Sequence, residues 1–160
     1  MSTRNHGLWW GLVGALLTAS LVLAVGWGRP QELTSLDDDL TGAAAAALAG
    51  DGLLDLRDVT DVDWDQLGLF LPYSGSEAVQ RELGVRMPAA ADRKMNSESD
   101  EFLAFVRDGN LVAWAVIGRG RISVLAPPGT YEAEDAVFAV ESPDEGLNFW
   151  LGLGPAGDRG

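Results

Sequence analysis

The sequence predicts an α+β protein in which an N-terminal transmembrane helix precedes a small antiparallel β-sheet packed against one or two helices. Three observations support this prediction. An apolar run near the N-terminus is long enough to cross a bilayer. An alanine run and a helix-capping pattern predict helices in the first half of the chain. Short apolar runs separated by Gly, Asp, Asn and Pro predict strands in the second half.

The apolar run extends from Leu8 to Trp27 and contains no charged residue. A helix of about 20 residues spans about 30 Å, the thickness of the hydrocarbon core of a bilayer. Tryptophans near both ends, with arginines just outside, are typical of a segment anchored at both membrane interfaces. We therefore expect a transmembrane helix at residues 8–28. Its expected membrane-interface residues are Arg4, Trp9, Trp10, Trp27 and Arg29.

This segment is expected to stay uncleaved as a single-pass anchor, because the apolar region of a signal peptide is usually shorter. The alternative is secretion after cleavage near Ala24-Val25-Gly26. A short tail, residues 1–7, ahead of a large acidic domain favours a cytoplasmic N-terminus and an extracytoplasmic C-terminal domain. The charge asymmetry supports this weakly, because Arg4 and the terminal amine barely outnumber Arg29.

The rest of the chain is strongly acidic and contains no cysteine. All 24 acidic residues lie after position 30, against nine basic residues, which gives this part a formal charge of −15. Such a surface repels phosphate backbones and anionic lipid head groups, so we expect no nucleic-acid partner. The absence of cysteine excludes disulfides, thiolate zinc sites and a lipid-bearing cysteine anchor. The expected partners are the membrane and an unidentified protein or small ligand.

Residues 29–60 are expected to form an acidic linker and an Ala-rich helix. Pro30 ends the membrane helix because it cannot continue the hydrogen-bond ladder. Ser35 is placed to cap a new helix whose first turn contains Asp37, Asp38 and Asp39. The alanine run continues that helix to Leu48, and the Gly50-Asp51-Gly52 sequence ends it.

Residues 61–152 are expected to form the α+β domain, and residues 153–160 a flexible tail. A first strand is predicted at Val62–Leu71, before a Pro-Tyr-Ser-Gly turn. The S-x-x-E pattern of Ser74 and Glu77 then opens a short helix that ends at Gly84. The polar stretch Pro88–Asp100 is expected to be an exposed loop.

Asp108-Gly109-Asn110 separates two apolar runs, Phe102–Arg107 and Leu111–Ile117, and so predicts a β-hairpin. In the first run, both the odd and the even positions are apolar, so one face of the sheet is expected to lie under the helices and the other to be partly covered. Pro127-Pro128-Gly129 breaks the chain. Further strands are predicted at Arg121–Leu125, Ala136–Val140 and Leu147–Leu151.

Several of these motifs resemble a group of uncharacterised exported bacterial proteins, often lipoproteins. The similar features are Asp63-Trp64-Asp65, a strand closing on Pro72-Tyr73, a helix ending in Leu83-Gly84, and the hairpin at residues 102–113. Asp135–Phe138 is similar to their closing strand. The resemblance covers residues 61–141 and implies an envelope location and an α+β fold. It implies no activity and no binding residues, and this chain departs from the group by its membrane helix.

No catalytic motif emerges from the sequence. The single histidine, His6, precedes the membrane segment, so schemes that need histidine or cysteine in the domain fail. We therefore predict that the protein is not an enzyme, and we predict no catalytic residue and no cofactor. The alternative is a membrane-anchored hydrolase that uses carboxylates or a metal, since a pair of carboxylates needs no fixed spacing.

Asp61, Asp63 and Asp65 are weak candidates for metal ligands. On a strand, their alternation would place three carboxylates on one face, where they could hold a hard cation such as Ca²⁺. An EF-hand is excluded, because Gln66 and Pro72 stand where it needs glycine and glutamate. The favoured interpretation is the solvent face of an edge strand, with Trp64 as a core anchor.

Aromatic residues are the remaining candidates for binding. Trp114, Phe149 and Trp150 could line a groove, although aromatic residues at strand spacing more often lie in the core. Tyr73, beside a proline at a strand end, is the candidate interaction residue. The sequence thus favours a non-enzymatic, membrane-anchored envelope domain that binds a protein or small ligand, or that supports an assembly.

Overall fold

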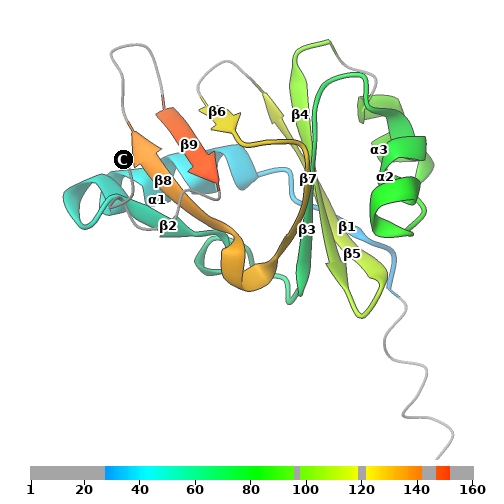
Figure 1. Cartoon of the computed structure of the whole chain (residues 1–160), viewed down its shortest axis with the longest axis horizontal. Coiled ribbons are helices and arrows are strands. Elements are labelled where there is room, and N and C mark those ends of the chain that lie inside the picture. The colour runs from blue at the N-terminus through cyan, green and yellow to red at the C-terminus, as the bar shows by residue number, and fades with distance from the viewer. Residues whose placement is uncertain (1–27, 96–97, 119–121, 142–146, 152–160) are drawn as a thin grey trace, which may run out of the picture.

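The computed structural model describes residues 28–95, 98–118, 122–141 and 147–151, and these residues form an α+β fold (Figure 1). Residues 1–27 lie outside the described residues, and with them the predicted membrane-interface residues Arg4, Trp9, Trp10 and Trp27. The predicted tail, residues 153–160, also lies outside them. Within the described part, no helix is both long and apolar enough to cross a membrane. The predicted membrane helix therefore stays a prediction.

The described elements are, in chain order, β1 (Gln31–Glu32), α1 (Leu36–Ala49), β2 (Leu53–Asp55), the 3₁₀ turn η1 (Leu56–Asp58), β3 (Gln66–Phe70), α2 (Gly75–Leu83), α3 (Ala89–Met95), β4 (Asp100–Arg107), β5 (Asn110–Gly118), β6 (Ile122–Leu125), β7 (Gly129–Glu132), η2 (Ala133–Asp135), β8 (Val137–Glu141) and β9 (Leu147–Leu151). The strands form a five-stranded sheet, ordered β1-β5-β4-β3-β7, and a four-stranded sheet, ordered β2-β8-β9-β6. Helices α2 and α3 cover one face of the larger sheet, while α1 and the smaller sheet lie on the other side (Figure 1).

The β4–β5 hairpin is the predicted one and forms the centre of the larger sheet. Asp108 and Gly109 adopt φ values of 49° and 71°, the left-handed conformation that a tight two-residue hairpin turn requires. Strand β3 pairs antiparallel with β4, and β7 pairs antiparallel with β3. Strand β1 pairs parallel with β5 through Gln31 and Glu32, so the sheet is mixed.

Strand β4 is buried on both faces, whereas its apolar pattern predicted only partial cover for one of them. Phe102, Ala104 and Val106 pack against α2 and α3, in one core with Val79 and Met95. Successive side chains of a strand point to opposite faces, so the intervening positions meet a second core. Leu103 and Phe105 accordingly pack with side chains of α1 and the smaller sheet, among them Leu36, Leu40, Leu54 and Phe138.

Helix α1 forms where the alanine run predicts it and contributes to the core. Leu36, Leu40, Ala44 and Ala47 are buried along one face, at spacings close to the helical repeat. Ser35 precedes the helix but makes no side-chain cap, because its hydroxyl donates to Asp39 instead, at 2.8 Å. Residues set apart in the sequence as an acidic linker and helix thus pack in the same core as the later strands.

The predicted loop at Pro88–Asp100 is wrong in its first half, where α3 forms. Ala91 and Met95, four residues apart, are buried on the face that this helix turns toward the sheet. The predicted capping box is also absent, because Ser74 Oγ donates to the carbonyl of Leu71 at 2.7 Å. Gly84 does end α2, in the left-handed conformation at φ 70°.

The sequence predicted a single antiparallel sheet, whereas the structure contains two sheets. Each of them combines parallel and antiparallel strand pairs. Strand β6 pairs parallel with β9 in the smaller sheet, and β2 pairs antiparallel with β8. The first strand begins at Gln66 rather than Val62, because residues 61–65 follow an irregular path. Strand β7 directly follows Pro127-Pro128. The sequence did not predict this strand, because the two prolines indicate a break in the chain.

Gly68 predicts a measurable packing limit between β3 and α2. A Cβ at this position would lie 2.5 Å from Leu83 Cδ1 and 2.6 Å from Phe70 Cε2, so both side chains would have to move. We expect Gly68→Ala to destabilise the protein by about 1–3 kcal/mol in urea unfolding followed by circular dichroism. Gly42→Ala, at an exposed position of α1, is the matched control. A Cβ at Gly42 would meet nothing within 4 Å. That change should stabilise the helix by about 0.5–1 kcal/mol, and equal effects at the two positions would contradict the packing argument.

Candidate functional site

A groove of about 460 Å³ lies where three chain segments meet beside the start of β5. Residues 28–30 form one wall, residues 84–86 the connection after α2, and residues 109–112 the hairpin turn and the first residues of β5. The left-handed residues Gly84 and Gly109 turn the chain at two of these segments. Pairing of β1 with β5 brings the third segment alongside. We call this feature the Arg29–Arg86 groove.

The Arg29–Arg86 groove is positively charged within an acidic domain. It is lined by two exposed arginines, Arg29 and Arg86, and by no carboxylate. Arg57, Arg81, Lys94 and Arg107 each form an ion pair within the described part of the chain. Neither groove arginine has such a pair among the described residues. Guanidinium groups donate to phosphate and carboxylate oxygens, so the groove is suited chemically to an anion.

A second hollow, of about 380 Å³, lies over Thr60 and Trp64. Its floor is a buried hydrogen-bond chain in which Trp64 Nε1 donates to Thr60 Oγ1 at 2.9 Å. That hydroxyl in turn donates to the Leu56 carbonyl at 3.1 Å. Trp64 is buried and packs edge-on against Phe105, so the expectation of a core anchor is confirmed. Because the polar groups in this row of hydrogen bonds satisfy one another, they stabilise the segment from Leu56 to Trp64. They do not offer free donors to a ligand.

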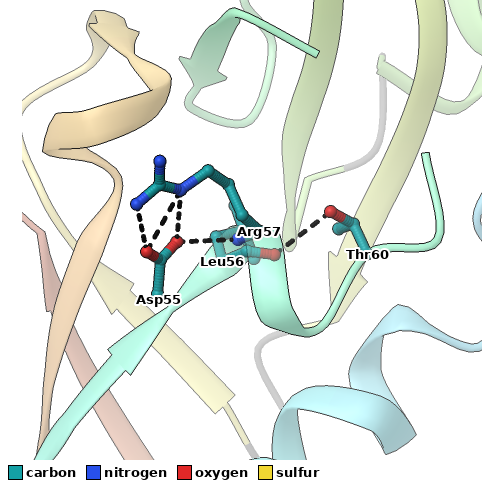
Figure 2. A network of polar contacts seen from close by, with 4 residues as sticks. All are labelled: Asp55, Leu56, Arg57 and Thr60. Carbon is teal, nitrogen blue, oxygen red and sulfur yellow. Dashed lines mark hydrogen bonds and ion pairs between the residues drawn. The ribbon is translucent and has the colours of Figure 1, made fainter. Parts of the chain in front are cut away.

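Arg57, which also lines this second hollow, forms an extensive ion pair with Asp55 (Figure 2). The guanidinium contacts both carboxylate oxygens, with Nη2 at 2.5 Å from Oδ2, and the backbone N–H of Arg57 donates to Oδ1 at 2.9 Å. These contacts lower the pKa of Asp55 from its ordinary value of 3.8. The side-chain hydrogen bond from Arg57 is the largest cause, and partial burial opposes it.

The three aspartates that were candidate metal ligands do not share a strand face. Residues 61–65 precede β3, so the strand alternation behind that hypothesis, and behind the edge-strand interpretation, does not apply. Asp63 pairs with Arg107, and Asp65 Oδ2 accepts from the backbone N–H of Asp108 at 2.8 Å. Asp61 is exposed. Among the described residues, no three His, Cys, Asp or Glu side chains are placed to hold a metal ion.

Tyr73 protrudes from the turn between β3 and α2. Its side chain is 61% exposed, and Leu71 beside it is 40% exposed. The backbone of Tyr73 lies at φ 64°, a conformation that is strained for a residue other than glycine. Partial desolvation raises the pKa of its phenol, and a hydrogen bond with Glu98 adds to that rise. Tyr73 is thus presented outward, and its role in an interaction stays a prediction.

Two of the other aromatic candidates do not line a groove, and the side chain of the third, Trp150, lies outside the described part of the structure. Trp114 and Phe149 are buried in the two cores, as the core interpretation predicts. Nothing in the sequence pattern indicated Arg86, because its groove exists only after α2, β1 and the hairpin come together. Arg29 was noted as a membrane-interface residue, and the structure places it in the wall of that groove.

Comparisons with known proteins find no match: no family model, no curated protein and no solved structure resembles the chain. The resemblance to exported bacterial proteins therefore stays a prediction, and the site is interpreted from its own geometry.

The hydrogen bond between Thr60 and Trp64 predicts a loss of stability in Thr60→Val. This change keeps the shape of the side chain but leaves the buried indole N–H without its acceptor, which costs about 1–3 kcal/mol. Thr60→Ser keeps the hydroxyl and should lose about 1 kcal/mol or less. Urea unfolding of the two variants checks this. A valine variant as stable as the serine variant would show that the hydrogen bond does not stabilise the fold.

The ion pair of Asp55 predicts a pH-dependent contribution to stability. Because its pKa in the folded state is lowered from 3.8, the carboxylate stabilises the fold above that value and loses the effect as pH falls toward the folded pKa. Asp55→Asn should therefore lower the urea midpoint at neutral pH, and the gap from the parent should close below pH 3.8. Asp61→Asn, at an exposed position, is the control and should show no such closing gap.

Proposed function

We propose that this protein is a single-pass, membrane-anchored protein of the cell envelope whose acidic domain binds a ligand or protein partner without catalysing a reaction. The observation that carries the proposal is the Arg29–Arg86 groove, which begins at the residue where the predicted membrane helix ends. A charged groove at that position is suited to binding, because its two arginines are available to an external anion.

The sequence supports the membrane part of the proposal. The uncharged run from Leu8 to Trp27 has the length of a bilayer core and carries tryptophans near both ends. In the proposed orientation the N-terminus lies in the cytoplasm and the acidic domain outside. The rival outcome is secretion after cleavage of the segment.

The arrangement of carboxylates supports binding over hydrolysis. The acids that might have met in a cleft around Trp64 instead have structural partners, since Asp63 pairs with Arg107 and Asp55 pairs with Arg57. Asp65 accepts a backbone hydrogen bond that fixes the β4–β5 turn. A carboxylate that holds a cation or a backbone N–H in place is poorly suited to proton transfer in a reaction.

Fractionation of the full chain tests the anchor. We expect the intact protein to stay in the membrane fraction after an alkaline carbonate wash, whereas Leu16→Arg should leave it, since arginine at the centre of a membrane helix costs about 3 kcal/mol. A shortened parent protein in the culture medium would show cleavage and overturn the anchor.

Cysteine labelling tests the orientation in the same cells. The sequence has no cysteine, so a single introduced thiol gives no background. Arg93→Cys, at an exposed position of α3, should react with a membrane-impermeant thiol reagent in intact cells, and Ser2→Cys should react only after lysis. The reverse pattern would place the domain in the cytoplasm.

A further inference from the structure

The Arg29–Arg86 groove combines two cationic side chains with apolar ones. Val85 is buried at its edge, and Leu111 and Val112 are half-buried in it. A groove with this lining is suited to an amphipathic molecule that has an anionic group next to an apolar part. We propose that the groove binds the phosphate of an anionic lipid head group at the membrane surface. This inference rests on the proposed membrane anchor.

The carboxylates nearest in sequence to the two arginines have other partners. Glu32, three residues after Arg29, pairs with Lys94. Glu82 pairs with Arg81 at 3.0 Å, and Asp108, in the hairpin turn, lies 3.7 Å from Arg107. Each local acid is thus matched to a different base. The two groove arginines are therefore left available for an anion from outside the described chain.

The position of the groove favours a lipid over a soluble anion. Gly28 and Arg29 line it, so it lies beside the first residues that the structure describes. In the proposed anchor this is where the helix leaves the bilayer, at the depth of the phosphate groups. Two arginines can each donate two hydrogen bonds to one phosphate, which fixes the head group in orientation as well as in place.

The acidic surface of the domain strengthens this choice. The part of the chain after residue 30 carries a formal charge of −15, which repels a soluble anion before it reaches the groove. A head group held in the adjacent membrane surface does not have to cross that field. The domain as a whole should also be repelled by anionic lipid, so any preference for such lipid has to come from a local site.

The test uses the full chain in lipid nanodiscs made of phosphatidylcholine alone or mixed with phosphatidylglycerol. Amide resonances of Gly84, Gly109 and Asn110 report on the groove. We expect phosphatidylglycerol to shift these resonances in the parent protein. In Arg86→Ala the fraction of phosphatidylglycerol that gives half of the shift should rise about tenfold, which corresponds to the loss of one charge-assisted contact.

Arg93→Ala is the matched control. Arg93 is exposed on α3, has no ion pair among the described residues and lies outside the groove, so its loss changes the net charge equally. This variant should bind as the parent does. Equal weakening in both variants would show general attraction rather than a site, and would overturn the proposal. Resonances away from the groove report that both variants are folded.

Three further outcomes would also overturn the inference. In neutral detergent micelles, inorganic phosphate that shifts the groove resonances while phosphatidylglycerol does not would make the ligand a soluble anion. A chain that elutes apart from the discs on size-exclusion chromatography would remove the anchor, and with it the lipid site. A chain that stays in the disc with unshifted groove resonances would remove the lipid site alone and leave the anchor intact.

Discussion

Burial of β4 on both faces is the constraint on which the rest of the fold depends. Six consecutive residues of this strand, 101–106, are buried, so a single layer of cover cannot satisfy it. Helices α2 and α3 cover Phe102 and Val106 on one side, while α1 and the smaller sheet cover Leu103 and Phe105 on the other. The small residues Ala113 and Ala115 of β5 lie in the core on the α1 side, where small side chains allow close packing.

The sequence predicted the elements whose signals are local. The hairpin follows from Asp108-Gly109, which supplies the left-handed turn, and α1 follows from its alanines. Pairings between distant segments could not be predicted in this way. Neither the parallel contact of β1 with β5 nor that of β6 with β9 leaves a pattern in the residues themselves. Helix α3 was missed because its small and polar residues are equally typical of loops, and only burial of Met95 decides between them.

The candidate site shows the same difference between local sequence signals and contacts of distant segments. Alternation of Asp61, Asp63 and Asp65 has a meaning only on a strand, and the chain becomes a strand only after Asp65. Asp63 and Asp65 instead hold the hairpin, through Arg107 and the N–H of Asp108. The groove, in contrast, is assembled from three segments that are distant in sequence. Arg29 and Arg86 lie on separate connecting segments of the chain. The sequence does not show that they come together, because this depends on the pairing of β1 with β5.

Pairing of charges explains how an acidic domain can contain a cationic groove at all. With more acids than bases, most basic side chains are expected to find a carboxylate, and the described pairs of Arg57, Arg81, Lys94 and Arg107 follow that expectation. Arg29, Arg86 and Arg93 depart from it, and of these three only Arg29 and Arg86 line the groove. Salt screens the repulsion from the surrounding acids within about 8 Å at physiological ionic strength, whereas contacts between a guanidinium and an anion inside the groove are screened much less. The long-range field therefore opposes approach of a soluble anion while the short-range contacts favour a bound one. An anion that is already held beside the groove, as in a membrane surface, benefits from the contacts without having to cross the field.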